Sequence, residues 1–517
     1  MLELVWFICK IAIWILCFII AAVFYLAVVK PYLFRRKYGK YSNVYMDKGF
    51  IPLLGDLIYH VYDEKANKVH YDHLRKIANE VHKYDLKVEV EGMTPMLVFI
   101  SNKAVKEVIS LMPDKVDKIS WPKGLMKMAV GSFSMNPTTH NTKSRRKEIF
   151  NILGLNSASR YIPLMVDRTK EFLEKIRKEK KVDFLHEANF LTFKIFIFIL
   201  FGNDMHHLTE KKYPFERPDG TIDHITLCEI FIQLGKDYMV EFIHPITSLI
   251  PPLNDYNFIG PWRRNNKNFT VFKDALREMI SESKDQNSLW NMMSQLNQFT
   301  DDEIFHDLVL LMIGGSETSS HCLCSIFYYL AKFPEARKKL REELDKFGLK
   351  KGSNLEASIK MEVIEKLDYL SWVIKEALRM DPPIPTSFFY EAKEDIKIAD
   401  VPIDKGTLFK FEVVGPHYNE DYWIEPAKFI PDRFDPESEI YQDSMKQDKG
   451  KGVFSRRYFG QGIRGCPGQS FGTLELKIMV SYLFPEMDYT VEQELLDNDD
   501  IGFGIGTHFK ANFEIKS

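Results

Sequence analysis

One cysteine, Cys466, lies in a short loop that also holds four glycines and one arginine. A cysteine thiolate binds soft and borderline metals, including the iron of haem. Glycines let a backbone approach a flat cofactor closely, because they have no Cβ atom. The apolar segment 469–483 follows with helical character, and N–H groups at its start would favour an anionic sulfur. The loop therefore predicts a haem–thiolate site, where the sulfur favours O–O cleavage.

Two other interpretations of this loop stay open at this point. Gly460, Gly462 and Gly465 also match the dinucleotide-binding pattern G-x-G-x-x-G. That pattern must follow a strand and open a βαβ unit of about 30 residues, whereas Cys466-Pro467 follows here and little chain remains. The cysteine could also be a buried structural thiol, since free cysteines are commonly buried.

An acid and a hydroxyl, Glu317 and Thr318, are neighbours in a long apolar stretch, just after Gly314 and Gly315. Glycine inside a helix reduces its stability by about 1 kcal/mol relative to alanine. The two adjacent glycines are therefore expected to have a role that offsets this loss. Glycine permits a bend, and a threonine hydroxyl can bond a nearby carbonyl. An acid beside a hydroxyl in a buried helix can carry protons, which oxygen activation needs. The alternative is a close helix–helix contact in which Glu317 pairs with a base.

A third pattern is the pair Glu376 and Arg379, which would lie on one face of a helix at spacing i,i+3. Alone, this pattern is more often an ordinary surface ion pair of little energy. Pro382 and Pro383 follow it, and Arg433 comes later in the sequence Phe-Ile-Pro-Asp-Arg-Phe.

Together these segments resemble the cytochrome P450 family of haem-thiolate monooxygenases. The haem-binding loop, the oxygen-binding helix and the E-x-x-R helix of that family occur here in the same order. The matching positions are Phe459, Gly462, Arg464, Cys466 and Gly468 of the loop, Gly315, Glu317 and Thr318 of the helix, and Glu376, Arg379 and Arg433.

The resemblance implies haem b with an axial thiolate from Cys466, and Arg464 as a ligand of a haem propionate. It implies that Thr318 steadies bound dioxygen and that Glu317 relays protons. It also implies a buried structural network of Glu376, Arg379 and Arg433. Family branches that rearrange peroxides tend to lack the acid–threonine pair, so its presence favours monooxygenation.

Some positions depart from the family pattern. The family usually has Trp or His followed four residues later by a propionate-binding Arg. Here His140 is followed at that distance by Ser144, with Arg145 and Arg146 next. We take His140 and Arg145 as the candidates, although either arginine could serve. Tyr390 stands where the family has another propionate-binding arginine.

Substrate and electron donor are expected to be separate molecules. The apolar segment 384–389 lines the pocket in the family, which favours a lipophilic substrate. No flavin or nicotinamide domain fits in the chain, so an NADPH-dependent flavoprotein reductase, with cytochrome b5 as a further donor, is implied. Basic clusters at 449–457 and 143–147 are candidate docking surfaces for an acidic donor.

The elements that must position these residues are mainly helical. The chain has 517 residues, of which 45% are hydrophobic, and its net charge of −3 gives no reason to expect a nucleic-acid partner. We expect a mainly α fold with a minor β part, the cytochrome P450 fold. The expected elements are a hairpin over 86–100, two strands within 396–414, and helices over 300–333, 334–347 and 361–380.

The N-terminus predicts a membrane anchor. Residues 11–29 are uncharged and apolar over about the length that spans a bilayer, and 4–9 extend the run. Basic residues follow it, which places the body in the cytosol; a cleaved signal peptide is the alternative. The six cysteines suggest no disulfide framework, which fits a reducing compartment.

We therefore expect a transmembrane anchor (4–29), a basic linker (30–57) and one catalytic domain (58–517), held at the endoplasmic reticulum membrane and facing the cytosol. The predicted activity is insertion of one oxygen atom from O₂ into a lipophilic molecule. Two rivals remain: a haem-thiolate isomerase or dehydratase acting on a peroxide, and a haem-binding carrier or sensor without turnover.

Overall fold

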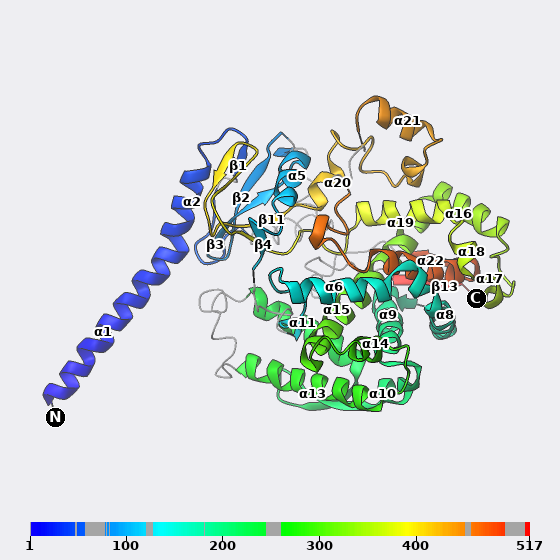
Figure 1. Ribbon diagram of the computed structural model, residues 1–517, viewed down its shortest axis with the longest axis horizontal. Helices are drawn as coiled ribbons and strands as arrows, with labels where there is room; N and C mark the ends of the chain where they lie inside the picture. Colours follow the sequence, from blue (N-terminus) through cyan, green and yellow to red (C-terminus); the bar gives the residue numbers. More distant parts are fainter. Residues whose placement is uncertain are drawn as a thin grey trace.

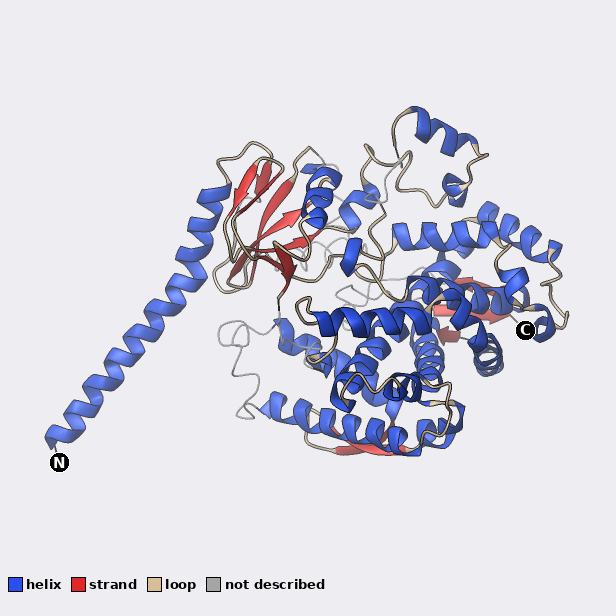
Figure 2. Ribbon diagram, viewed as in Figure 1, coloured by secondary structure: helices blue, strands red, loops and turns tan. Residues whose placement is uncertain are grey.

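The computed structural model describes residues 2–46, 49–56, 78, 80–81, 83–119, 128–179, 181–243, 260–449, 456–491 and 512–516. It is mainly helical with a minor β part, as predicted (Figure 2). A six-stranded sheet lies to one side of a larger helical body (Figure 1).

The longest helix of the body is α15 (Asp301–Lys332), which confirms the helix predicted over this segment. Thr300 caps its start in a capping box with Glu303, and Phe333 ends it before α16 (Pro334–Lys346). Helix α9 (Phe184–Phe201) packs along it, and the Thr192 hydroxyl donates to the carbonyl of Ser316 at 2.8 Å. The predicted oxygen-binding segment therefore lies inside the body.

The single helix predicted over 361–380 is wrong. The structure divides this segment into α18 (Met361–Ile364) and α19 (Asp368–Met380). The Glu343 carboxylate accepts hydrogen bonds from the backbone N–H groups of Tyr369 and Leu370 at 2.7 and 2.9 Å. It thereby caps α19 from another helix, a long-range contact that hydrophobic periodicity does not contain.

Helix α22 (Gln469–Glu486) follows the cysteine loop, as predicted. The other α-helices are α5 (Asn102–Ser110), α6 (His140–Leu153), α7 (Leu155–Ala158), α8 (Ile162–Ile176), α10 (His206–Glu210), α11 (Leu227–Ile243), α13 (Gly260–Glu282), α14 (Leu289–Gln295), α17 (Leu355–Ser358), α20 (Val414–Tyr418) and α21 (Glu439–Lys446).

The large sheet has the order β1-β2-β3-β11-β8-β4. Its hairpin of β2 (Leu86–Glu91) and β3 (Thr94–Phe99) is the one predicted. Its other strands are β1 (Val44–Met46), β11 (Leu408–Phe411), β8 (Tyr390–Ala392) and β4 (Val116–Lys118). The smaller sheets pair β9 (Ile396–Ile398) with β10 (Val401–Ile403), β6 (Lys212–Glu216) with β7 (Ile222–Thr226), and β13 (Asn512–Lys516) with β12 (Asp488–Val491) and β5 (Lys181–Asp183).

The segment 396–414 forms three strands rather than the two predicted. Ala399 and Asp400 have φ values of 46° and 67°, so a tight turn separates β9 from β10 before β11 begins. Non-glycine residues seldom adopt this left-handed conformation, so their sequence gives no turn signal.

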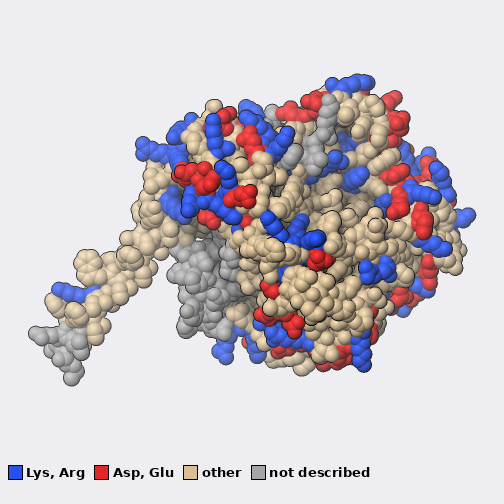
Figure 3. All heavy atoms as spheres, in the orientation of Figure 1, with Lys and Arg blue, Asp and Glu red and all other residues tan. Residues whose placement is uncertain are grey.

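The N-terminal helix projects from the sheet and away from the body (Figure 1). It runs through α1 (Leu2–Phe24), the π-helical turn η1 (Tyr25–Val29) and α2 (Lys30–Tyr38). Residues Val5–Tyr38 are long and apolar enough to cross a membrane, and only 6% of the most apolar stretch is buried. The projecting part shows few charged side chains in Figure 3. Helix α9 passes the same test but is 78% buried, as a core helix is.

Part of the predicted linker 30–57 belongs to the folded body. Tyr38 is buried in the apolar core of the large sheet, and residues 44–46 form strand β1, which pairs with β2. The basic residues of α2 share their helix with the buried Tyr38, so composition alone predicted a basic linker.

Candidate functional site

The cysteine loop is a closed turn between the 3₁₀ turn η8 (Gly462–Arg464) and α22. The N–H of Cys466 donates to the carbonyl of Phe459 at 2.7 Å, which ties the two ends of the loop together. Gly460 and Gly462 have φ values of 64° and 63°, a region that disfavours residues with a Cβ. At Gly462 a Cβ would also lie 2.6 Å from Ile109. Both glycines are therefore required by the path of the loop.

The Cys466 side chain is solvent-accessible, yet burial raises the pKa of its thiol. Both hold for a thiol that solvent reaches although protein surrounds it on most sides. The N–H of Gly468, just before α22, and the charge of Arg146 act in the opposite direction and lower that pKa. A metal bound to the sulfur would remove its proton outright.

Three cations gather beside this loop. Arg146 of α6 donates to the carbonyl of Gly465, next to the cysteine. Lys118 of β4 is the register partner of Tyr390 in β8. Burial, and then the charges of Arg464 and Arg146, lower the pKa of Lys118 to about 7. The positive charges of the cluster therefore repel one another, and an anionic ligand would be stabilised there.

One carboxylate, Asp117, partly balances these cations. Its Oδ1 accepts from Arg464 Nη2 at 2.6 Å. Burial would raise the pKa of Asp117, but the bonds from Arg464 and the backbone of Thr138 outweigh it and hold that pKa low. The predicted propionate ligand Arg464 is therefore already fixed in place by an ionised partner.

The two early-helix candidates lie elsewhere. Arg145 donates to Asp307 Oδ1 at 2.9 Å and to the carbonyl of Glu303 at 3.2 Å, so it joins α6 to α15. His140 is exposed at the start of α6. The structure brings Arg146, and neither His140 nor Arg145, to the cysteine loop.

Sequence reasoning missed Lys118 altogether. It reaches the site only because β4 pairs with β8, a contact between segments far apart in the chain. Its ammonium donates to the carbonyl of Ser134 at 2.9 Å and lies 4.7 Å from the ring centre of Phe388. It thus connects the cation cluster with the apolar segment 384–389.

The predicted oxygen-binding segment presents one accessible face on a helix that is otherwise largely buried. Gly314 is exposed and Thr318 partly so, one turn apart, whereas Glu317 is buried. The Thr318 hydroxyl donates to the carbonyl of Gly314 at 2.6 Å. A Cβ on Gly314 would meet nothing within 4 Å, but one on Gly315 would lie 1.9 Å from the ring of Phe196. One glycine therefore serves packing against α9, and the other leaves space in front of the helix.

A buried acid connects this helix to the cysteine helix. Ser319, next to Thr318, donates to Glu475 Oε2 of α22 at 2.6 Å. Burial raises the pKa of Glu475 to about 8, against the lowering effect of the Ser319 bond. The acid is therefore mainly protonated at neutral pH, and its second oxygen has no hydrogen-bond partner among the residues that the structure describes.

Glu376, Arg379 and Arg433 meet in one buried network. Glu376 Oε1 accepts from Arg379 Nη2 at 2.8 Å and from Arg433 Nε at 2.9 Å. Burial would raise the pKa of Glu376, but the two arginines hold it below its usual value. Arg379 also donates to the carbonyl of His417, whose ring accepts the N–H of Arg457 just before the cysteine loop. The network thus connects α19 to the base of that loop.

These residues fit a haem. The cysteine thiol is solvent-accessible, three cations at its loop suit two propionates, and open space lies before Gly314. Among the residues that the structure describes, no group of three or more His, Cys, Asp or Glu side chains could hold a metal ion.

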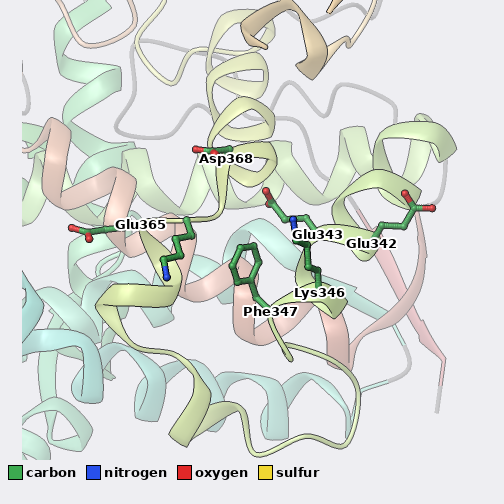
Figure 4. Close-up of a pocket in the computed structure, with 7 residues that line it drawn as sticks. Glu342, Glu343, Lys346, Phe347, Glu365 and Asp368 are labelled. Atoms are coloured by element: carbon green, nitrogen blue, oxygen red, sulfur yellow. The ribbon is translucent and has the colours of Figure 1, made fainter. Parts of the chain in front are cut away.

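A pocket of about 650 Å³ lies elsewhere, against α16, α18 and α19 (Figure 4). Glu343, which caps α19, lies in its wall. Its lining residues are Glu342, Glu343, Lys346, Phe347, Glu365, Lys366 and Asp368. None of them is a predicted site residue, so this pocket is separate from the cysteine site.

Comparison with known proteins identifies what the chain is similar to. The family model described as "Cytochrome P450" matches residues 67–507. Cytochrome P450 26A1 of Gallus gallus is 25% identical over 391 residues, which cover 74% of this chain and 73% of that protein. Cytochrome P450 3A18 of Rattus norvegicus is 28% identical over 54% of each chain. Beta-amyrin 28-monooxygenase of Barbarea vulgaris is 30% identical over 39% of each.

Proposed function

Since the chain belongs to the cytochrome P450 family, we propose that it is a monooxygenase that inserts one oxygen atom from O₂ into a lipophilic small molecule. Members of this family bind haem b through a cysteine thiolate. The observation that carries the proposal is a solvent-accessible Cys466 in a loop at which Lys118, Arg146 and Arg464 gather. Its loop leads into α22, which Glu475 joins to α15 at the buried Ser319.

In this proposal Cys466 would hold the haem iron through its thiolate, and Arg146, Arg464 and Lys118 would bind the propionates. When bound, the haem supplies the iron at which O₂ is activated. Arg464 is held by Asp117, so little side-chain entropy remains to be lost when it binds a carboxylate. Burial is the main cause of the lowered pKa of Lys118, and an anion bound there would offset the second cause, the charges of Arg464 and Arg146.

Thr318 and Glu317 would hold and pass on the protons that oxygen activation needs. The Thr318 oxygen is partly accessible, and its own proton is engaged by the Gly314 carbonyl, so it can accept a hydrogen bond from a bound species. Glu317 is buried next to it, away from bulk water. The isomerase or dehydratase alternative has no use for such a pair.

Electrons come from a separate protein, for which we propose an NADPH-dependent flavoprotein reductase, with cytochrome b5 as a further donor. Of the basic residues considered for docking, Arg457 is buried and donates to the carbonyls of Glu412 and Ile100. It therefore supports the fold, and docking falls to the remaining basic residues. The apolar N-terminal helix supports anchoring at the endoplasmic reticulum membrane, where lipophilic substrates concentrate.

The test is reconstitution of the full chain with an NADPH-dependent flavoprotein reductase and panels of fatty acids, sterols and xenobiotics. We expect NADPH consumption coupled to a product that contains ¹⁸O from labelled O₂. Thr318→Ala should consume NADPH with several-fold less product, and Thr318→Ser, which keeps the hydroxyl, should retain most of the coupling. Turnover of a peroxide without NADPH would instead identify an isomerase or dehydratase.

A further inference from the structure

The segment 128–138 connects helix α15 with the cations beside the cysteine loop. Its first half lies against α15. A Cβ on Gly131 would lie 2.4 Å from the ring of His306, so the backbone there packs closely against that ring. The N–H of Phe133 donates to Asp307 Oδ1 at 2.7 Å, and both residues are almost fully buried. This half of the segment is therefore fixed to α15.

Helix α6 holds the same half through Arg145. Its Nη1 donates to the carbonyl of Gly131 at 3.2 Å and to Asp307 Oδ1 at 2.9 Å. The side chains of Arg145 and Asp307 are 4% and 1% exposed, so water does not compete for these bonds. Two helices thus determine where the first half of the segment lies.

The second half, residues 134–138, contacts the cations themselves. Arg464 Nη2 donates to the carbonyl of Asn136 at 3.0 Å. The N–H of Thr138 donates to Asp117 Oδ2 at 2.6 Å. Asp117 is the ion-pair partner of Arg464, so this half of the segment contacts both members of that pair.

The side chain of Asn136 connects the two halves. Its Nδ2 donates to the carbonyls of Val130 and Ser132, at 2.8 Å each. Both neighbours are acceptors, so only the NH₂ group of the amide can face them. Asn136 is therefore bonded to the fixed first half through its side chain and to Arg464 through its carbonyl.

This arrangement leaves one nitrogen of Arg464 for a ligand. Nε and Nη2 donate to Asp117 Oδ1 at 3.1 and 2.6 Å, and Nη2 also donates to Asn136. Nη1 has no hydrogen-bond partner among the residues that the structure describes. Because a guanidinium is planar, holding Nε and Nη2 also fixes the direction of Nη1.

We propose that Asn136 is a positioning residue for Arg464, which holds the guanidinium at a place set by α6 and α15 so that Nη1 meets an anionic group of the cofactor. The inference rests on the proposed function in that this anion is taken as a haem propionate. Without the Asn136 side chain, the carbonyl that Arg464 contacts is no longer tied to the first half of the segment. Arg464 then keeps Asp117 but binds the propionate less firmly.

A double-mutant cycle separates this role from a general effect on the fold. The measurement is the rate of haem transfer from the full-length holoprotein to an excess of a haem-accepting apoprotein. Asn136→Ala and Arg464→Gln should each speed the transfer several-fold. Asn136→Ala should have no further effect in the Arg464→Gln background, because it acts through that arginine.

Ser132→Ala is the matched control within the same segment. Its buried hydroxyl has no hydrogen-bond partner among the described residues, and the substitution keeps the carbonyl that Asn136 contacts. Its haem should transfer at the rate of the unsubstituted protein. A rate as fast as that of Asn136→Ala would show that any loosening of the segment suffices, and would overturn the proposal.

The propionate bending band in the resonance Raman spectrum reports the contact directly. It should shift in the same direction in Asn136→Ala and Arg464→Gln and stay in place in Ser132→Ala. Effects on the transfer rate that multiply in the double variant, or an unshifted band in Asn136→Ala, would overturn the proposal. If Asn136→Ala does not fold, Asn136→Leu, which is similar in shape, replaces it. Failure of both to fold would show a role in folding alone and contradict the proposal.

The proposed function can fail separately. A haem-loaded protein in which Asn136 depends on Arg464, but which never consumes NADPH, would support the inference and contradict the monooxygenase. Coupled turnover with multiplying effects on haem transfer would do the reverse. A protein that takes up no haem would contradict both.

Discussion

Arg145 and Arg146 are chain neighbours with different surroundings. Adjacent residues point about 100° apart on a helix, so one contacts Asp307 of α15 while the other contacts the carbonyl of Gly465. The sequence spacing left both arginines as candidate propionate ligands. It did not distinguish them, because which of the two faces the cysteine loop depends on how α6 packs. Cys466 and Arg464 needed no such choice, since their loop is local in sequence.

Arg146→Gln should weaken haem binding without unfolding the protein, because it removes one of three cations beside the loop. The measurement is the haem content per protein after purification, together with the rate of haem transfer to an excess of an acceptor protein. We expect transfer to be several-fold faster. Lys147→Gln, an equal loss of charge at the next, exposed position, is the matched control and should behave like the unsubstituted protein.

At the scale of elements, the bounds of α15 could be predicted from the sequence, whereas the contacts between helices could not. The capping box of Thr300 and Glu303 and the following Pro334 define its ends locally. The division of 361–380 depends on Glu343 from α16, and the approach of Phe196 to Gly315 depends on α9. Such partners lie too far away in the chain for a sequence pattern to report.

The two adjacent glycines of α15 should respond oppositely to substitution by alanine. Gly315→Ala places a methyl group into the ring of Phe196 and should destabilise the protein by about 1–3 kcal/mol through overpacking. Gly314→Ala meets nothing within 4 Å and should stabilise the helix by up to about 1 kcal/mol. Unfolding midpoints in denaturant measure both, and equal effects would contradict the assigned packing role of Gly315.

Glu475 should make stability fall as the pH rises. Its pKa in the folded protein, about 8, is raised above the ordinary 4.5. Its contribution is therefore full below pH 4.5 and is lost progressively as the pH rises toward 8, at no more than about 1.4 kcal/mol per unit. Glu475→Gln should be close to neutral at pH 5 and relatively more stable at pH 8. Parallel stability curves for the two proteins would refute a buried, protonated Glu475.

On the scale of the whole molecule, the fold class and the order of the main motifs follow from the sequence, whereas the boundary between anchor and body does not. Helix α1 continues through η1 into α2 without a break, and Tyr38 ends it inside the sheet core. The apolar stretch can be recognised from composition alone. The burial of Tyr38 at its end cannot, because it depends on packing against a sheet built from distant parts of the chain.

Removal of residues 2–29 should therefore release the protein from membranes while its unfolding midpoint changes little, because that segment has few contacts with the body. Removal of residues 2–43 should also lower the unfolding midpoint, since it takes Tyr38 from the core. Membrane sedimentation and thermal unfolding of both truncations test this. Equal midpoints would show that α2 belongs to the anchor alone.

The central claim is that Cys466 binds haem iron as a thiolate, and the most direct test is the Soret spectrum of the reduced protein with carbon monoxide. A strongly red-shifted Soret band, absent from Cys466→Ser, is the predicted result. A haem-loaded protein whose reduced carbon monoxide complex lacks that shift, or a Cys466→Ser variant that keeps it, would contradict the account.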